Sequence, residues 1–261
     1  IQFKDKGKEL DDLYKNDTQK YADYNLKDAQ LVLDILDKSN ILKYTIKRSF
    51  LTGLHLDRVS ASIAALDSQY IRKAKQRGLV VPSLLHAEKE QGIKGGFVRE
   101  SQPGIYDNVI VLDFKSLYPS IMRTFNIDPA SYVKSGKGKN LVKAPNGACF
   151  RNEEGILPEI LEELWAARDE AREKKDELAR YAIKILMNSF FGALATPNSR
   201  FFNMEIANAI THYGQYFIKM TAQKIEKAGY KVIYGDTDSI FIAPETKDYD
   251  KATKIGQTLQ E

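Results

Sequence analysis

The chain has 261 residues, of which 43% are hydrophobic and 28% are charged, as in an ordinary globular protein of one or two domains. Its net charge of +4 is compatible with a nucleic-acid partner but does not by itself indicate one. Cys149 is the single cysteine, which excludes a disulfide framework and favours a reducing compartment. No apolar run reaches the roughly 18 residues of a membrane span. The sequence starts at Ile1 without a signal peptide and stops inside a helical pattern, so we expect a piece of a longer protein.

The first third of the chain has the pattern of helices. Residues 1–20 are polar and rich in lysine, with no core pattern. Further on, apolar residues recur at helical spacing in three stretches, residues 21–40, 41–50 and 60–77. Gly53 and Gly78 are expected to end the second and the third. In the first stretch Tyr24 and Asp28 stand at i and i+4 and share a helix face, for which a solvated polar surface is the alternative to a functional role.

Two stretches have the composition of loops. Residues 92–104 are rich in glycine, and the adjacent Gly95 and Gly96 would let the backbone pass close to another backbone or to a phosphate chain. A plain flexible loop explains them equally well. Residues 131–155 carry several lysines, which we expect in water, with contact to a nucleic-acid backbone as the alternative.

A short apolar run, residues 109–113, ends on an acid. It predicts a buried strand that delivers Asp113 at its end. The following residues turn into a helix that is expected to start near Ser116 or Pro119. A carboxylate in this setting serves as a metal ligand or as a helix cap, and the residues themselves favour neither.

A second acidic segment lies 123 residues further on, after a long helix predicted over residues 204–229. The apolar runs around Asp236 and Asp238 predict a hairpin with a tight polar turn. On an extended backbone two residues two apart project from the same face, and two close carboxylates that stay ionised usually have a cation between them. An exposed acidic turn is the alternative, and it is weakened by the matching setting of Asp113.

Between the acids, two charged helical patterns cover residues 157–181 and 178–193 and predict an antiparallel helix pair. Arg168 and Arg172 form an i, i+4 pair on the first helix. On the second, one face carries Lys184, Asn188 and Phe191. Arginine and lysine on neighbouring helices can bind a triphosphate, whereas intrahelical pairing with the many nearby acids is the alternative.

Three segments together resemble the polymerase signatures of family B DNA polymerases: residues 113–121, 184–192 and 234–239. Residues 21–29, with Tyr24 and Asp28, are similar to the last motif of the family's 3′–5′ exonuclease domain. Gly95 and Gly96 resemble the glycine pair between exonuclease and palm. Residues 101–106 and the short fingers insertion most resemble the bacterial DNA polymerase II branch.

The resemblance implies a two-metal site. Asp113 and Asp238 would hold two divalent ions, Mg²⁺ with Mn²⁺ as an alternative, with Asp236 beside them and the backbone carbonyl of Phe114 as a further ligand. One ion would activate the primer 3′-hydroxyl and the other would bind the triphosphate. The sequence agrees, because it shows no Ser–His or Cys–His arrangement and has only three histidines.

The resemblance also assigns the nucleotide and DNA contacts. Phosphates would be bound by Arg168, Arg172, Lys184 and the backbone N–H groups near Ser116 and Leu117. Asn188 would lie near the incoming nucleotide. Tyr118 would pack under the deoxyribose and exclude a 2′-hydroxyl, with a simple plug of the strand–helix junction as its alternative. Contacts to DNA are implied for Gly95, Gly96, Phe191, Gly192 and Thr237.

The sequence departs from the family pattern at several points. Phe191 stands where a tyrosine is usual, which puts one contact to the primer–template minor groove in doubt. Ile93 replaces the tyrosine that usually precedes the glycine pair, as in the polymerase II branch. The first exonuclease motifs and the thumb are missing. We therefore expect no proofreading and poor retention of primer–template DNA by this chain.

We expect an α+β fold, with an antiparallel palm sheet, two antiparallel finger helices and preceding helices from the end of an exonuclease domain. The expected domains are that exonuclease end, the first palm part, the fingers and the second palm part, at residues 1–50, 51–155, 156–196 and 197–261. The expected function is template-directed DNA synthesis, with primer–template DNA and dNTPs as partners, in the bacterial cytoplasm. A sliding clamp would bind through parts outside this chain. The alternatives are a non-catalytic scaffold and another palm-type phosphoryl transferase, such as a cyclase.

Overall fold

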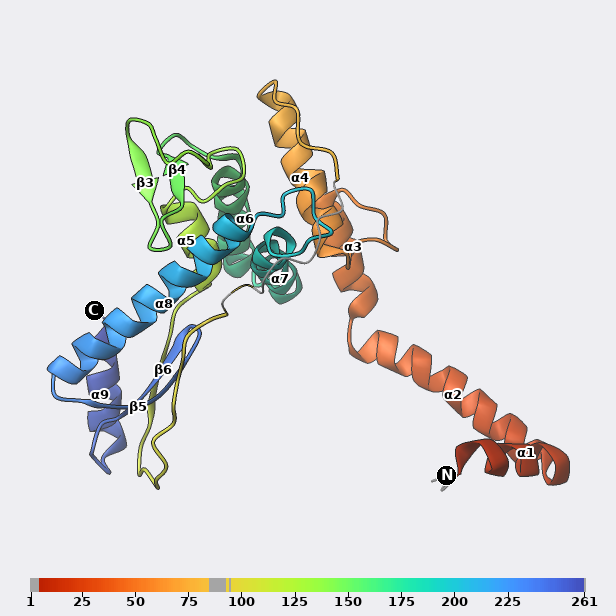
Figure 1. Ribbon diagram of the computed structural model, residues 1–261. Coiled ribbons are helices and arrows are strands. Elements are labelled where there is room, and N and C mark those ends of the chain that lie inside the picture. Colours follow the sequence, from red (N-terminus) through yellow and green to blue (C-terminus); the bar gives the residue numbers. More distant parts are fainter. Residues whose placement is uncertain (1–4, 85–92, 94, 261) are drawn as a thin grey trace.

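The computed structural model describes residues 5–84, 93 and 95–260 (Figure 1). Four helices come first: α1 (Lys6–Asn16), α2 (Thr18–Lys38), α3 (Ile41–Thr52) and α4 (Ser62–Gln76). Helix α1 falls in the polar segment for which the sequence offered no core pattern. Asp5 caps its first turn, and at its end the Asp17 N–H donates to the Leu13 carbonyl while the Asp17 side chain caps the first turn of α2. Helix α1 buries no residue.

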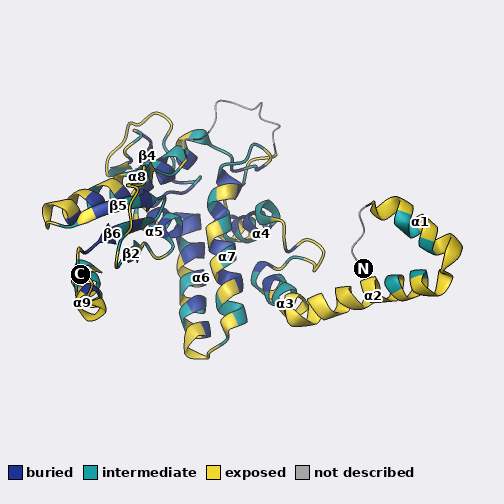
Figure 2. Ribbon diagram, turned by 90° about the horizontal axis from the view of Figure 1, so that it is seen from below, coloured by how far each residue is buried: buried dark blue, intermediate teal, exposed yellow. Residues whose placement is uncertain are grey.

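Helices α1 and α2 extend away from the rest of the molecule and are exposed along their length (Figures 1 and 2). The apolar residues that predicted α2, such as Leu26 and Ile35, are 70% and 63% exposed. The two glycine stops are confirmed. Gly53 ends α3 in a left-handed conformation, and Gly78 does the same after α4, where the Leu79 N–H donates to the Ala74 carbonyl as in a Schellman motif.

The sheet has four antiparallel strands in the order β1-β5-β6-β2. Their bounds are β1 (Val98–Arg99), β2 (Ile110–Asp113), β5 (Lys231–Asp236) and β6 (Ser239–Ala243). One face packs against α8 (Met204–Lys227) and α9 (Tyr249–Gln260) through an apolar cluster that includes Ile218, Ile225 and Leu259. The other face stays partly open.

Strand β2 corrects the prediction of a wholly buried strand. It is an edge strand whose residues alternate between partial burial and exposure, and Val111 is 51% exposed. The physical reason is that only the face with Ile110 and Leu112 is covered by helices. Asp113 therefore stands on the open face.

The predicted helix pair is α6 (Ile156–Glu173) and α7 (Glu177–Leu194), which lie side by side (Figure 2). The first helix ends earlier than predicted, because Lys175 takes a left-handed conformation and Asp176 caps α7 by accepting from the Ala179 N–H. A large apolar core joins α4, α6, α7 and the first half of α8 to α5 (Leu117–Thr124). A small hairpin, β3 (Leu141–Lys143) and β4 (Cys149–Arg151), lies beside it. The fold is α+β, as predicted.

No helix in the described part of the chain is both long enough and apolar enough to cross a membrane.

Candidate active site

The register of the sheet places two of the three predicted acids in one row. Asp113 on β2 pairs with Ser239 on β6, and Ser239 pairs with Asp236 on β5. Residues in one row point to the same face, so both carboxylates stand on the open face. Two strand spacings, about 10 Å, separate their backbones. Strand β6 therefore separates Asp236 from Asp113, although both carboxylates lie on the same face of the sheet.

Asp238 occupies the turn between β5 and β6. Thr237 before it has φ of 50°, and the Asp238 N–H lies 2.5 Å from the Asp236 carbonyl oxygen. This tight turn invalidates the extended-backbone argument that put Asp236 and Asp238 on one face. The Asp238 carbonyl accepts from the Phe114 N–H at 2.8 Å, which fixes the turn against the end of β2. The carboxylate of Asp236 instead accepts from the Thr237 and Tyr234 hydroxyls, at 2.9 and 3.4 Å.

The glycine pair lies against this turn. A methyl group on Gly96 would lie 2.6 Å from Thr237 Oγ1, whereas one on Gly95 would meet nothing within 4 Å. The Thr237 N–H donates to the Phe97 carbonyl at 3.0 Å, and Gln215 on α8 donates to the Gly95 carbonyl at 2.7 Å. Close backbone approach, one of the two sequence-based interpretations, is what Gly96 provides. The partner is the acidic turn itself.

A cavity of about 400 Å³ opens between the end of β2, the turn after β5, and helices α5, α6 and α7. We call it the acid pocket. It is lined by Asp113, Phe114, Lys115, Ser116, Leu117, Tyr118, Pro119, Arg168, Lys184, Asn188, Thr237 and Asp238. The structure thus brings together residues from all three signature segments. Of the residues predicted to bind metal or nucleotide, Asp236 and Arg172 do not line it.

A hydrogen bond between Ser116, at the start of α5, and Arg168, on α6, joins two walls of the acid pocket. Ser116 is the N-cap of α5 in a left-handed conformation, with no side-chain cap hydrogen bond, so the first N–H groups of α5 remain available to an anion. Its hydroxyl accepts from Arg168 Nη1 at 3.1 Å. Arg168 is only 8% exposed, and its Nε has no hydrogen-bond partner in the described part of the chain. Burial lowers the pKa of Arg168, and the nearby charges of Arg172 and Arg180 lower it further.

The other cationic side chains near the pocket differ in whether a carboxylate is paired with them. Lys184 and Asn188 are exposed on α7 and line the pocket. Arg172 forms an ion pair with Asp169 at 3.0 Å within its own helix, which is the intrahelical alternative considered for these residues. Lys115 lines the pocket but was missed by sequence reasoning. The signal that could have found it is its place in the turn between Asp113 and Ser116.

Tyr118 forms one wall of the acid pocket. Its half-buried ring packs against Phe191 with 4.7 Å between ring centroids, and it also covers Gly214 on α8, where a methyl group would lie 3.1 Å from the tyrosine Cε1. Burial raises the pKa of Tyr118, and the charges of Asp238 and Asp236 raise it further. The phenol therefore remains neutral and acts through its shape. Gly192 is exposed beside Phe191, outside the pocket lining.

The electrostatics of the pocket favour a cation. Burial raises the pKa of Asp238, and the charge of Asp113 raises it further, whereas Lys184 lowers it. These two carboxylates and the Phe114 backbone carbonyl form a set of oxygen donors of the kind that Mg²⁺ prefers. Within the described residues, no group of three or more His, Cys, Asp or Glu side chains is placed to hold a metal ion. The side chains that could hold a metal ion in the acid pocket are therefore two carboxylates, those of Asp113 and Asp238.

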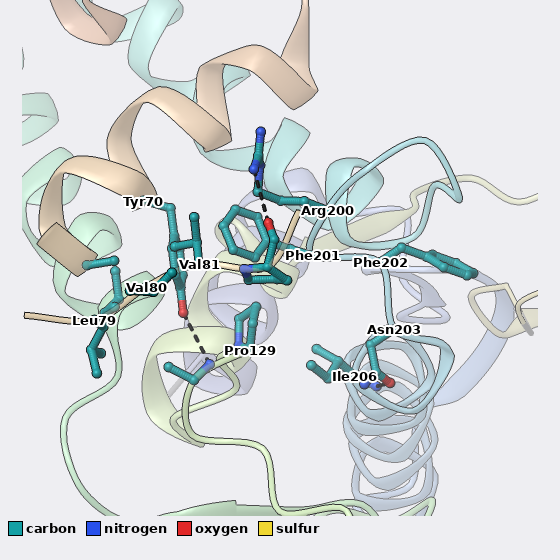
Figure 3. A pocket seen from close by; sticks show the side chains of 14 residues that line it. Tyr70, Leu79, Val80, Val81, Pro129, Arg200, Phe201, Phe202, Asn203 and Ile206 are labelled. Atoms are coloured by element: carbon teal, nitrogen blue, oxygen red, sulfur yellow. Dashed lines mark hydrogen bonds between the residues drawn. The ribbon is translucent and has the colours of Figure 1, made fainter. Parts of the chain in front are cut away.

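The remaining candidates lie elsewhere. Tyr24 and Asp28 are on α2, far from the acid pocket (Figure 1). A second cavity, of about 350 Å³, lies between α4 and the start of α8 (Figure 3). It has mainly apolar walls, including Tyr70 and Phe201, and contains none of the predicted site residues. In Figure 3 the Tyr70 hydroxyl, one of the groups that line this cavity, accepts a hydrogen bond from the Ala130 N–H at 3.2 Å.

Comparison with known proteins identifies the class. The profile of DNA polymerase family B matches residues 60–261. The chain is 39% identical to DNA polymerase II of Escherichia coli over 259 residues, which cover 98% of this chain and 33% of that protein. It is 34% identical to the DNA polymerase delta catalytic subunit of Arabidopsis thaliana, covering 93% of this chain and 25% of that one.

A solved structure gives the same answer for the fold. The family B DNA polymerase of the archaeon Pyrobaculum calidifontis matches with a TM-score of 0.70 and 29% sequence identity, over 89% of this chain and 33% of that one. The protein belongs to DNA polymerase family B. It spans about a third of the length of the bacterial relative, with 33% of that protein covered.

Proposed function

We propose that this chain forms the nucleotide-binding and catalytic part of a DNA-directed DNA polymerase, which joins dNTPs to the 3′-hydroxyl of a primer on a DNA template. The observation that carries this proposal is the acid pocket, where Asp113 and Asp238 face Arg168 and Lys184 across one cavity. The expected domain limits, at residues 50, 155 and 196, the bacterial cytoplasmic location and a sliding clamp as partner belong to the same proposal.

The residues of this chain would hold two Mg²⁺ ions, or Mn²⁺ in their place, through Asp113, Asp238 and the Phe114 carbonyl. When bound, such ions activate the primer hydroxyl and neutralise charge on the transferring phosphate. Arg168 and Lys184 bind the triphosphate, and the free N–H groups at the start of α5 add neutral donors. No side-chain nucleophile is needed, because an in-line attack on phosphorus depends on positioning and on charge stabilisation.

The other pocket residues align and select the nucleotide. Tyr118, backed by Phe191, would pack under the deoxyribose of the nucleotide and leave no room for a 2′-hydroxyl. Asn188 stands one helical turn from Lys184 on the same face of α7 and contacts the nucleotide. The DNA contacts expected for Gly95, Gly96, Phe191, Gly192 and Thr237 belong to the same proposal.

A titration of Mg²⁺ and a dNTP against the chain tests this function, with the variants Asp113→Asn and Asp236→Asn. We expect metal-dependent nucleotide binding that Asp113→Asn abolishes and Asp236→Asn largely keeps, since Asp236 lies outside the acid pocket. Absence of binding in the unaltered chain would contradict the proposal.

A second candidate function is a non-catalytic relative that binds DNA without turnover. The position of Asp236, the one predicted acid outside the pocket, favours it. It predicts that the chain binds primer–template DNA equally well with and without Mg²⁺ and shows no metal-dependent affinity for a dNTP. The same titration therefore separates the two functions.

A further inference from the structure

Lys115 brings a positive charge to the acid pocket from the palm side. It follows Phe114 in the turn between β2 and α5, is exposed, and lines the cavity together with Asp113 and Ser116. Arg168 and Lys184 reach the same cavity from the two finger helices. The three cations therefore surround one space from different walls.

The ammonium group of Lys115 lies over the ring of Trp165 on α6, 5.7 Å from the ring centroid. Arg123 also contacts this ring, at 4.7 Å, but its Nη1 is paired with Glu162 at 2.8 Å. Among the residues that the structure describes, no carboxylate forms an ion pair with Lys115. A cation–π contact holds a lysine in place without neutralising its charge.

Counted without bound metal ions, the carboxylates of Asp113 and Asp238 balance the positive charges of Arg168 and Lys184. Lys115 adds one further positive charge, which is not paired with a carboxylate among the described residues. Divalent ions on the two carboxylates would add to this charge and would leave Lys115 free to contact phosphate oxygens. A charge-assisted hydrogen bond to phosphate is stronger than a cation–π contact at an exposed site, so an entering triphosphate would draw the ammonium away from the ring.

We propose that Lys115 is a further phosphate-binding residue of the acid pocket, held over Trp165 in the absence of nucleotide and transferred to the triphosphate when a dNTP binds. This inference rests on the proposed function. It adds a palm-side lysine to the cations of the two finger helices, and it makes the single tryptophan of the chain a reporter of nucleotide binding.

The test measures binding of dATP and of dAMP, each with Mg²⁺ at low ionic strength, to the full chain by titration and by Trp165 fluorescence. The variants are Lys115→Met, Lys115→Arg, Lys184→Met and Lys139→Met, the last an exposed loop lysine that serves as a control. We expect Lys115→Met to weaken dATP binding about tenfold, the factor that corresponds to about 1.4 kcal/mol. The affinity for dAMP should barely change, Lys115→Arg should restore dATP binding, and Lys139→Met should match the unaltered chain.

The fluorescence change on adding dATP should be present in the unaltered chain and lost in Lys115→Met. Unchanged dATP affinity in Lys115→Met, with loss in Lys184→Met, would overturn the role of Lys115 and leave the proposed function standing. Equal weakening of dATP and dAMP without rescue by arginine would mean that Lys115 only supports Trp165, which also overturns the proposal. No metal-dependent dATP binding by the unaltered chain would overturn both the proposal and the function on which it rests.

Discussion

Gly96 and Thr237 are in such close contact that a methyl group on the glycine would lie 2.6 Å from the threonine hydroxyl oxygen. The threonine cannot move away easily. It holds a left-handed backbone conformation, donates its backbone N–H to Phe97 and donates its hydroxyl to Asp236. Because Thr237 directly precedes Asp238, this contact fixes the position of the acidic turn relative to the backbone of Gly96.

Gly96→Ala should therefore displace the turn and weaken Mg²⁺-dependent dNTP binding by at least about tenfold, since misplacement of a catalytic group by about 1 Å costs up to about a hundredfold. Gly95→Ala is the matched control, because a methyl group there meets nothing within 4 Å, and we expect it to bind like the unaltered chain. Titration of both variants with Mg²⁺ and a dNTP measures this difference in affinity. Adding Thr237→Ala to Gly96→Ala removes the hydroxyl from the contact and should restore part of the affinity, whereas equal losses in the two glycine variants would show that the contact is unimportant.

Arg168 and Arg172 look alike in the sequence but should behave differently. Arg168 is buried, and its pKa is lowered by burial and by neighbouring arginines, so its charge is held at a cost in the absence of an anion. Arg168→Met should stabilise the nucleotide-free chain by about 1 kcal/mol while weakening triphosphate binding by at least about tenfold.

Arg172→Met serves as the control for this pair. Arg172 is exposed, forms an ion pair with Asp169 and lies outside the acid pocket. In the Arg172→Met variant we expect the free energy of unfolding to change by less than about 0.5 kcal/mol and the affinity for a triphosphate to fall only slightly. Urea unfolding and titration with dATP measure the two effects. A loss of stability in Arg168→Met, or an equal loss of affinity in both variants, would contradict this assignment.

Tyr118 should set the preference for deoxyribose. Its ring is held between Phe191 and Gly214, so it cannot swing aside for a 2′-hydroxyl. Tyr118→Ala should reduce the ratio of the affinity for dATP to the affinity for ATP about tenfold, a typical size for discrimination by one steric contact. Phe191→Ala should act in the same direction but more weakly, because it only loosens the ring. Tyr181→Ala, on the exposed surface of α7, is the control. An unchanged ratio of dATP to ATP affinity in Tyr118→Ala would show that the ring only fills the junction between β2 and α5.

The sequence predicted the elements well and some of the site less well, for identifiable reasons. Glycine stops, the helix pair and the acidic hairpin follow from local patterns, and the structure contains them. The argument that Asp236 and Asp238 share one face fails because the residue between them, Thr237, is left-handed, so the backbone is not extended there. Strand β2 was taken as buried because an apolar run carries no information about which face a helix covers.

The difference between Arg168 and Arg172 could not be predicted, because both belong to one helix face and only tertiary packing decides which is buried. Lys115 was overlooked for a related reason. Its contact with Trp165, which lies 50 residues away in the sequence, exists only because α5 packs against α6. Contacts between elements of this kind have no local sequence signal.

The ion pairs that join α4 to α6 predict a dependence of stability on pH. Lys73 donates to Glu159 at 2.8 Å and also pairs with Glu163, while Arg77 pairs with Glu159 and donates to the Glu154 carbonyl. The hydrogen bond from Lys73 lowers the pKa of the Glu159 carboxyl, and Arg77 lowers it further.

A carboxyl whose pKa is lower in the folded than in the unfolded chain stabilises the fold above its unfolded pKa, and this contribution is lost as the pH falls through the folded pKa. Glu159→Gln should therefore lower the free energy of unfolding at pH 7 by less than about 1 kcal/mol, as for other partly exposed pairs. The difference should shrink as the pH falls below about 4.3, the ordinary pKa of glutamate. Urea unfolding at a series of pH values measures it. Glu173→Gln, on the exposed last turn of α6, is the control and should differ little from the unaltered chain at any pH. A difference for Glu159→Gln that persists at pH values well below 4 would show that the side chain stabilises α4 against α6 by packing and not by its charge.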